Sequence, residues 1–154
     1  MNSPQIDESD RRILRALQRD SARSQRELAD EVGMSQSACW RRLKALEESG
    51  LITGHTIRLD PQGVGLDLTI FMMVRTRQHS SKWLATFRKE VSAIPNVIDF
   101  FRIAGDYDYM LKVVAADMND FDRVYQRIIA KVELESVTSY VTMEAILSGR
   151  DLPV

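Results

Sequence analysis

The chain has 154 residues, a net charge of −1 and one cysteine, and 44% of its residues are hydrophobic and 28% charged. This composition is typical of globular proteins and excludes an intrinsically disordered chain, and the length suits one medium domain or two small ones. The single cysteine excludes an internal disulfide and fits a reducing compartment, and the net charge near zero means that any attraction to nucleic acid has to be local.

The first part of the chain has apolar residues at helical spacing. Ile6, Ile13, Leu14 and Leu17 mark a first helix, for which Asp7 is available as the N-cap. The stretch 24–27 (Ser-Gln-Arg-Glu) has the form of a capping box and predicts the start of a second helix.

A tight turn is predicted between the second and third helices. Gly33 stands where a helix end needs a left-handed residue, and Ser35 can cap a third helix that ends at Gly50. Two helices joined by a short turn that contains glycine are typical of a helix-turn-helix.

The pattern changes between residues 51 and 67. Thr53-Gly54-His55 resembles a turn between two short β-prone stretches, so we expect a small β-hairpin, or wing, at this position. A proline and two glycines follow in 60–67 and indicate a linker. We therefore predict a winged helix-turn-helix domain over residues 1–60, a linker strand within 57–67, and a second domain over 61–154.

The second domain alternates strand-like and helix-like segments. Strands are predicted at 68–77, 96–105, 107–116 and 136–146, and helices at 81–94 and 118–132. This β-α-β-β-α-β order is that of a ferredoxin-like fold, so the predicted class of the whole chain is α+β. Helices cover one face of such a sheet, while apolar residues in 68–77 and 96–105 also supply the other face. We therefore expect self-association through the open face.

The third helix carries the main candidate for a nucleic-acid contact. On a helical wheel, Cys39, Leu43 and Leu46 form the buried stripe. The predicted DNA-binding residues are those of the remaining surface: Ser35, Gln36, Ser37, Trp40, Arg41, Arg42 and Lys44. Arginine can bond guanine O6 and N7, serine a base or phosphate, and lysine a phosphate, while the helix N-terminus suits a phosphate as well.

An ordinary solvated helix explains the same charges, because Lys44 and Glu48 can pair at i,i+4 spacing. The preceding capped helix, the short turn and the following wing favour DNA binding instead. Trp40 could either anchor the helix to its own domain or touch the DNA backbone, and we expect it to pack.

Catalytic motifs are scarce. His55 and His79 are far apart in the sequence, we interpret Cys39 as a small buried apolar group, and no phosphate-loop, dinucleotide or zinc motif occurs. We therefore predict no enzyme, no catalytic residue, no metal site and no cofactor. Two alternatives stay open. One is an enzyme that uses Asp106, Asp108 or His79. The other is an architectural DNA-binding oligomer without an effector.

The stretch 26–54 and the segment 104–113 (AGDYDYMLKV) together resemble the Lrp/AsnC (feast/famine) transcription regulators, over nearly the whole chain. The resemblance implies a winged helix-turn-helix followed by a ferredoxin-like ligand-sensing (RAM) domain. It also implies dimers formed through the sheets, further assembly into tetramers or octamers, and an amino acid bound between dimers.

The resemblance also places the effector site. It implies that Ala104, Gly105, Asp106, Tyr107 and Asp108 form the ligand-binding turn, whose main chain holds the effector carboxylate while Asp108 accepts its ammonium. Thr138, Ser139 and Tyr140 would close the pocket from a neighbouring dimer. From the residues alone, the preferred interpretation of the same stretch is a hairpin with a turn glycine, a turn aspartate and strand aromatics.

Within the family, the segments 38–47, 78–83, 104–110 and 152–154 most resemble cysteine-responsive regulators of the DecR type. The resemblance therefore implies L-cysteine as the effector. A dimer with two recognition helices is expected to bind a pseudo-palindromic operator in double-stranded DNA. No apolar run approaches the roughly 20 residues that span a bilayer, and the first ten residues lack a signal sequence, so we expect a cytoplasmic protein without a membrane partner.

Overall fold

The structure of the chain is a computed structural model that describes residues 6–154. It consists of two compact units, one made of the chain up to Arg58 together with Leu147–Val154, the other of Leu59–Ile146. The second unit thus lies between two parts of the first in the sequence. Residues 147–154, which the sequence analysis assigned to the second domain, lie with the first.

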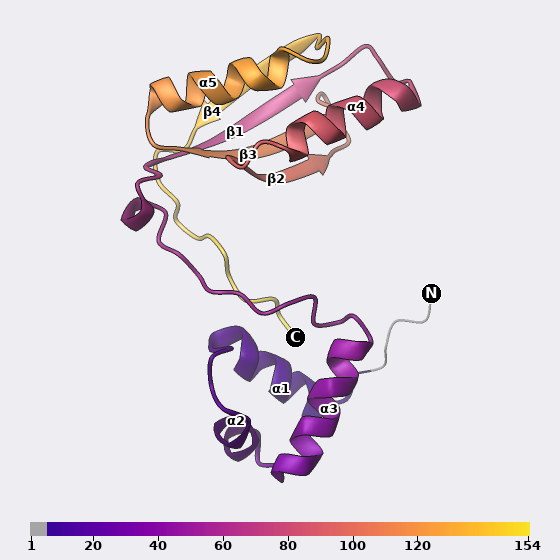
Figure 1. Cartoon of the computed structure of the whole chain (residues 1–154), viewed down its shortest axis with the longest axis vertical. Helices are drawn as coiled ribbons and strands as arrows, with labels where there is room; N and C mark the ends of the chain where they lie inside the picture. Colours follow the sequence, from indigo (N-terminus) through magenta and orange to yellow (C-terminus); the bar gives the residue numbers. More distant parts are fainter. Residues whose placement is uncertain (1–5) are drawn as a thin grey trace. The chain divides into compact units, whose positions relative to one another are not determined.

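The first unit has the predicted three helices (Figure 1). They are α1 (Glu8–Arg19), α2 (Gln25–Val32) and α3 (Gln36–Glu48). Asp7, Ser24 and Ser35 cap them through side-chain acceptors, and Gly33 ends α2 with a φ of 68°. Local capping signals therefore set these helix ends, as the sequence predicted. Their apolar faces meet in one core made of Ile13, Ala16, Leu28, Ala29, Val32, Cys39 and Leu46.

The β-hairpin expected around residues 53–55 is absent, and that expectation was wrong. Residues 51–60 contain no strand, and the main-chain bond from Ile52 N to Leu46 O (3.3 Å) leads back to the helix and not across a hairpin. Ile57 and Leu59 are 78% and 63% exposed. An isolated two-stranded hairpin is marginally stable, and while Ile52 packs against the helical core, Ile57 and Leu59 are not buried against any other element of the described chain.

The second unit has the predicted β-α-β-β-α-β order. Its elements are β1 (Leu68–Arg75), α4 (Ser81–Ser92), β2 (Val97–Arg102), β3 (Tyr109–Ala115), α5 (Met118–Ile129) and β4 (Ser136–Val141), preceded by a 3₁₀ turn, η1 (Gln62–Val64). The strand order is β2-β3-β1-β4, and each neighbouring pair is antiparallel. This is the ferredoxin-like arrangement, so the α+β class is confirmed.

Both helices of this unit lie on one face of the sheet (Figure 1). Alternate residues of β1, namely Ile70, Met72 and Val74, point into the core with Phe87 of α4 and Phe121 of α5. The core also holds an aromatic cluster of Trp83, Phe87, Phe100 and Tyr109, with ring centroids 4.9–6.2 Å apart in the contacting pairs. Such rings stabilise by area and by edge-to-face geometry.

The opposite face of the sheet carries no helix of the described chain. Its apolar residues alternate with the core residues and include Phe71, Met73, Phe101, Met110 and Tyr140. Phe101 and Tyr140 are 48% and 54% exposed. We call these five residues the open face. Within residues 6–154, no helix is long and apolar enough to cross a membrane.

Candidate DNA-binding surface and effector site

The outer surface of α3 is exposed and basic. Cys39 and Leu46 are buried and Leu43 is half-buried, so the helical wheel places the core stripe correctly. Six of the seven predicted DNA-binding residues are exposed: Ser35, Gln36, Ser37, Trp40, Arg41 and Lys44. The first turn holds no acidic side chain. A phosphate that approaches the helix N-terminus therefore meets main-chain N–H groups without a competing carboxylate.

Trp40 is 48% exposed and does not pack into the core, contrary to the expectation from sequence. The Lys44 Nζ lies 5.3 Å from the centroid of its ring, and the same Nζ is 3.6 Å from a Glu48 carboxylate oxygen. The ring of Trp40 therefore makes a cation–π contact with the Lys44 ammonium. Trp40 and Lys44 form a single aromatic and cationic ridge beside Arg41.

Arg42 differs from the other basic residues of α3. Its Nη1 lies 2.8 Å from a carboxylate oxygen of Asp7 and 2.8 Å from one of Asp10, and the Asp10 side chain is only 15% exposed. The pKa of Asp7 is lowered, first because its carboxylate accepts the Asp10 main-chain N–H and then because of Arg42. Arg42 thus ties α3 to the start of α1, and its charge is already paired.

Replacing Arg42 with glutamine should lower the melting temperature of the first unit by a few degrees at neutral pH. A carboxyl pKa that is lower in the folded state than its ordinary 3.8 stabilises the fold above pH 3.8, and this contribution disappears as the pH falls through the lowered value. The difference in melting temperature between Arg42→Gln and the wild type should therefore shrink in acid. A difference that does not shrink as the pH is lowered progressively from 3.8 until the fold is lost would contradict the ion-pair explanation.

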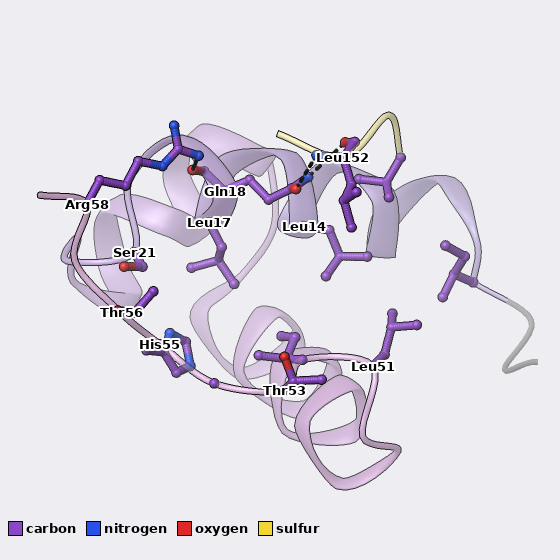
Figure 2. A pocket seen from close by; sticks show the side chains of 14 residues that line it. Leu14, Leu17, Gln18, Ser21, Leu51, Thr53, His55, Thr56, Arg58 and Leu152 are labelled. Atoms are coloured by element: carbon purple, nitrogen blue, oxygen red, sulfur yellow. Dashed lines mark hydrogen bonds between the residues drawn. The ribbon is translucent and has the colours of Figure 1, made fainter. Parts of the chain in front are cut away.

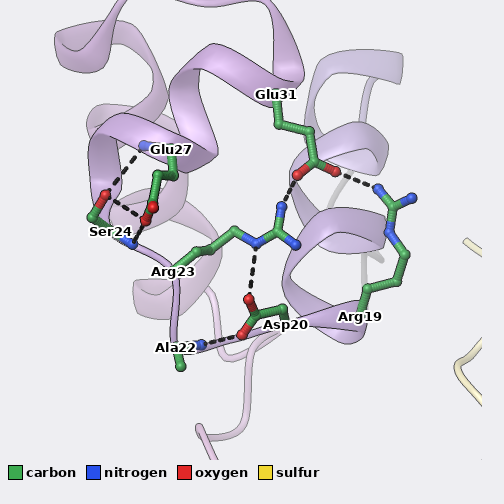
Figure 3. A network of polar contacts seen from close by, with 7 residues as sticks. All are labelled: Arg19, Asp20, Ala22, Arg23, Ser24, Glu27 and Glu31. Carbon is green, nitrogen blue, oxygen red and sulfur yellow. Dashed lines mark hydrogen bonds and ion pairs between the residues drawn. The ribbon is translucent and has the colours of Figure 1, made fainter.

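A polar network fixes the connection between α1 and α2 (Figure 3). Glu31 of α2 accepts from Arg19 at 2.5 Å and also pairs with Arg23, whose Nε is 3.7 Å from Asp20. In the adjacent capping box, the Ser24 hydroxyl and N–H both donate to Glu27 at 2.8 Å and lower the pKa of its carboxyl. These contacts set the position of α2, which in turn supports α3.

The turn formed by residues 104–108, predicted to bind the effector, is held by main-chain and side-chain hydrogen bonds near the ends of β1, β2 and β3. Its residue Asp108 donates its main-chain N–H to Val74 O (2.9 Å), and its carbonyl accepts from Ile103 N (2.9 Å). The Asp108 Oδ2 accepts the Thr76 N–H at 2.8 Å. One carboxylate oxygen of Asp108 is therefore used to fix the turn, while no hydrogen bond within residues 6–154 engages its Oδ1.

Arg75, which the sequence analysis did not single out, supports the same turn. Its guanidinium donates to the Asp106 carbonyl and lies 5.5 Å from the centroid of the Tyr107 ring. The Tyr107 hydroxyl is 3.4 Å from Thr138 Oγ1, and its hydrogen bond with Tyr140 raises the pKa of Tyr140. The only feature of the sequence that could have indicated this role is a basic residue at the end of the predicted strand.

Of this turn, Tyr107 is in contact with Thr138 and Tyr140 of β4, while Asp106 is bonded by Arg75 and Asp108 by Thr76. Ala104 and Gly105 are exposed in this turn, where Gly105 has a φ of 132° that L side chains rarely adopt. Ser139 does not lie with the other two predicted residues of β4. It pairs with Met72 in the sheet, so its side chain lies on the face opposite Thr138 and Tyr140.

Comparison with known proteins gives two family matches. Residues 69–152 match the Lrp/AsnC ligand-binding domain, and residues 6–53 match a winged helix-turn-helix DNA-binding domain. The chain belongs to the Lrp/AsnC family. It is accordingly a DNA-binding transcriptional regulator with an amino-acid-binding domain, as the sequence predicted at this level.

Members of the Lrp/AsnC family resemble the chain over nearly all of its length. The DNA-binding transcriptional activator DecR of Escherichia coli K12 is 41% identical over 150 residues, which are 97% of this chain and 99% of that protein. The crystal structure of an AsnC family regulator from Agrobacterium tumefaciens has 43% identity and a TM-score of 0.93, covering 96% of this chain and 97% of that one.

A third similar protein was solved with a ligand. It is a transcriptional regulator of Neisseria meningitidis in complex with L-methionine, with 30% identity, a TM-score of 0.91 and 97% of both chains covered.

In the present Lrp/AsnC chain, residues 6–154 hold no cluster of three or more side chains suited to a metal ion.

Proposed function

We propose that the protein binds a pseudo-palindromic operator as a dimer or higher oligomer and responds to an amino acid, L-cysteine in the first place. The observation that carries the DNA-binding part is the exposed surface of α3, where Ser37, Arg41 and Lys44 lie together opposite the buried Cys39. In a dimer, two such helices would meet successive major grooves about one helical turn apart. A larger assembly would present several pairs and allow DNA to bend around it.

The proposed effector site is the turn formed by residues 104–108. Asp108 Oδ1 is the acceptor proposed for the ammonium, and the exposed main chain of Ala104 and Gly105 is proposed to hold the carboxylate. Thr138 and Tyr140 of β4, from this chain or from a neighbouring dimer, would border the site, with Ser139 behind them on the other sheet face. An effector can shift the equilibrium between two assemblies only if it binds them with different affinities.

L-Cysteine is proposed because the chain resembles DecR, and L-methionine is the second candidate because a regulator with 30% identity was crystallised with it. The test is a thermal-shift scan of the twenty standard amino acids, followed by operator binding with and without each amino acid that raises the melting temperature. A true effector should raise the melting temperature progressively with concentration and change operator affinity. If no amino acid does both, the sensor proposal fails and an architectural role takes its place.

The open face is proposed as the contact between subunits. Phe101 and Tyr140 are about half exposed there, and Phe71 and Met73 lie between them in the sheet. Replacing Phe101 with lysine should place a charge in the contact and shift the protein to a smaller species in light scattering. Glu90→Lys on α4, on the other side of the sheet, is the matched control. Unchanged molar mass in Phe101→Lys would remove the open face from the assembly.

A further inference from the structure

A short segment near the end of the chain lies on the DNA-binding unit. Residues 151–154 (Asp-Leu-Pro-Val) are held by α1 and by Arg58, which follows α3 by ten residues (Figure 2). Neither the core of the unit nor the proposed DNA-binding surface accounts for these contacts.

Gln18 of α1 recognises the main chain of the segment. Its Oε1 accepts the Leu152 N–H at 2.7 Å, and its Nε2 donates to the Leu152 carbonyl at 3.1 Å. One side-chain amide thus makes the two hydrogen bonds that a neighbouring β-strand would make with a residue. This reciprocal pair, visible as dashed lines in Figure 2, recognises the peptide main chain and not the leucine side chain.

Two arginines bind either side of Leu152. Arg58 pairs with the Asp151 carboxylate and also donates to the Gln18 carbonyl at 3.3 Å, while Arg15 Nε donates to the Val154 main-chain oxygen at 2.5 Å. Pro153 has no N–H that would need a partner, and the Val154 N–H is bonded to Leu152 O at 2.9 Å in a tight turn about the proline. The sequence of the segment therefore matches the donors and acceptors of the surface.

A partly open cavity of about 380 Å³ lies under the segment, lined by Leu14, Leu17, Leu51, Ile52, Leu152 and Val154, among others. Leu152 nevertheless remains 71% exposed. Polar contacts therefore hold the segment more than apolar burial does. Exposed hydrogen bonds and ion pairs contribute weakly one by one, so docking of this kind is reversible.

We infer that Arg15, Gln18 and Arg58 form a docking site for a short peptide segment, and that residues 151–154 of the same chain are its occupant. The consequence concerns connectivity. Residues 59–67 connect the two units covalently, and docking adds a second, noncovalent attachment at the far end of residues 142–150, which follow β4. The inference depends neither on the effector nor on the operator.

Cross-linking tests the docking site directly. Ser21 and Leu152 both line the cavity, and Ser21 makes none of the docking bonds, so Ser21→Cys with Leu152→Cys places two thiols across it. A bismaleimide long enough to span the cavity should join them within one chain, which intact mass and denaturing gels distinguish from a link between chains. The native Cys39 is buried, and its burial raises the pKa of its thiol, so it should react poorly. The two single-cysteine variants check this.

Further substitutions in the Ser21→Cys, Leu152→Cys protein distinguish specific docking from chance collisions of a segment that is only attached through the chain. Gln18→Ala should slow the intramolecular cross-link about tenfold, because both main-chain bonds are lost. Gln126→Ala on the exposed side of α5 should not change it. Asp151→Arg should slow the reaction, and adding Arg58→Asp should restore it. A link only between chains, no link at all, or an intramolecular link that Gln18→Ala leaves unchanged would each overturn the inference.

Discussion

Arg41→Ala is expected to weaken operator binding by about 1–3 kcal/mol, or about 5- to 150-fold in affinity, if its guanidinium bonds a guanine in the major groove. Unlike Arg42, Arg41 is exposed, and no ion pair within residues 6–154 engages it. Its side chain is therefore available to DNA without breaking a contact inside the protein. Fluorescence anisotropy with a selected operator measures the loss at constant salt.

Comparison with other basic residues separates base reading from general attraction. Lys44→Ala should reduce the slope of log affinity against log salt by about one, because a phosphate contact is lost. Arg88→Ala on the exposed side of α4 should change neither affinity nor slope. An Arg41→Ala protein that keeps wild-type affinity and selectivity would exclude Arg41 from the residues that read the operator.

The helices could be predicted closely because their signals are local. Asp7, Ser24 and Ser35 each cap a helix that starts at the next residue, and Gly33 ends α2 in the left-handed region. The strand order followed from the alternation of strand and helix patterns. The expected wing failed because a hairpin depends on pairing and packing partners that a local turn pattern around Gly54 does not supply.

The candidate site was predictable where helical periodicity decides exposure, as for Arg41 and Lys44. It was not predictable where a residue meets a partner far away in the sequence. Arg42 pairs with Asp7, 35 residues earlier, and Arg75 supports the turn 31 residues later. The docking of Leu152 on Gln18 spans 134 residues. No periodic pattern identifies such pairs, because each joins an ordinary polar side chain to a distant residue, and in two of the three cases to its main chain.

Asp108→Asn is expected to lower amino-acid affinity about 10- to 150-fold while operator binding without the amino acid stays near wild type. The substitution removes the negative charge proposed to receive the effector ammonium, and hydrogen bonds to charged groups contribute about 1.5–3 kcal/mol. Asparagine keeps a side-chain oxygen that can accept the Thr76 N–H. The turn between β2 and β3 should therefore persist, which Asp108→Ala would not guarantee.

Isothermal titration with L-cysteine and L-methionine measures the affinity, and the melting temperature without amino acid checks the fold. Asp122→Asn on the exposed side of α5 removes the same charge from the second unit away from the turn, and it should bind as the wild type does. If Asp108→Asn retains full affinity for the amino acid that the wild type binds, the carboxylate serves only to bond Thr76. The ammonium would then have to be bound elsewhere, with Asp106 as the nearest remaining carboxylate of the turn.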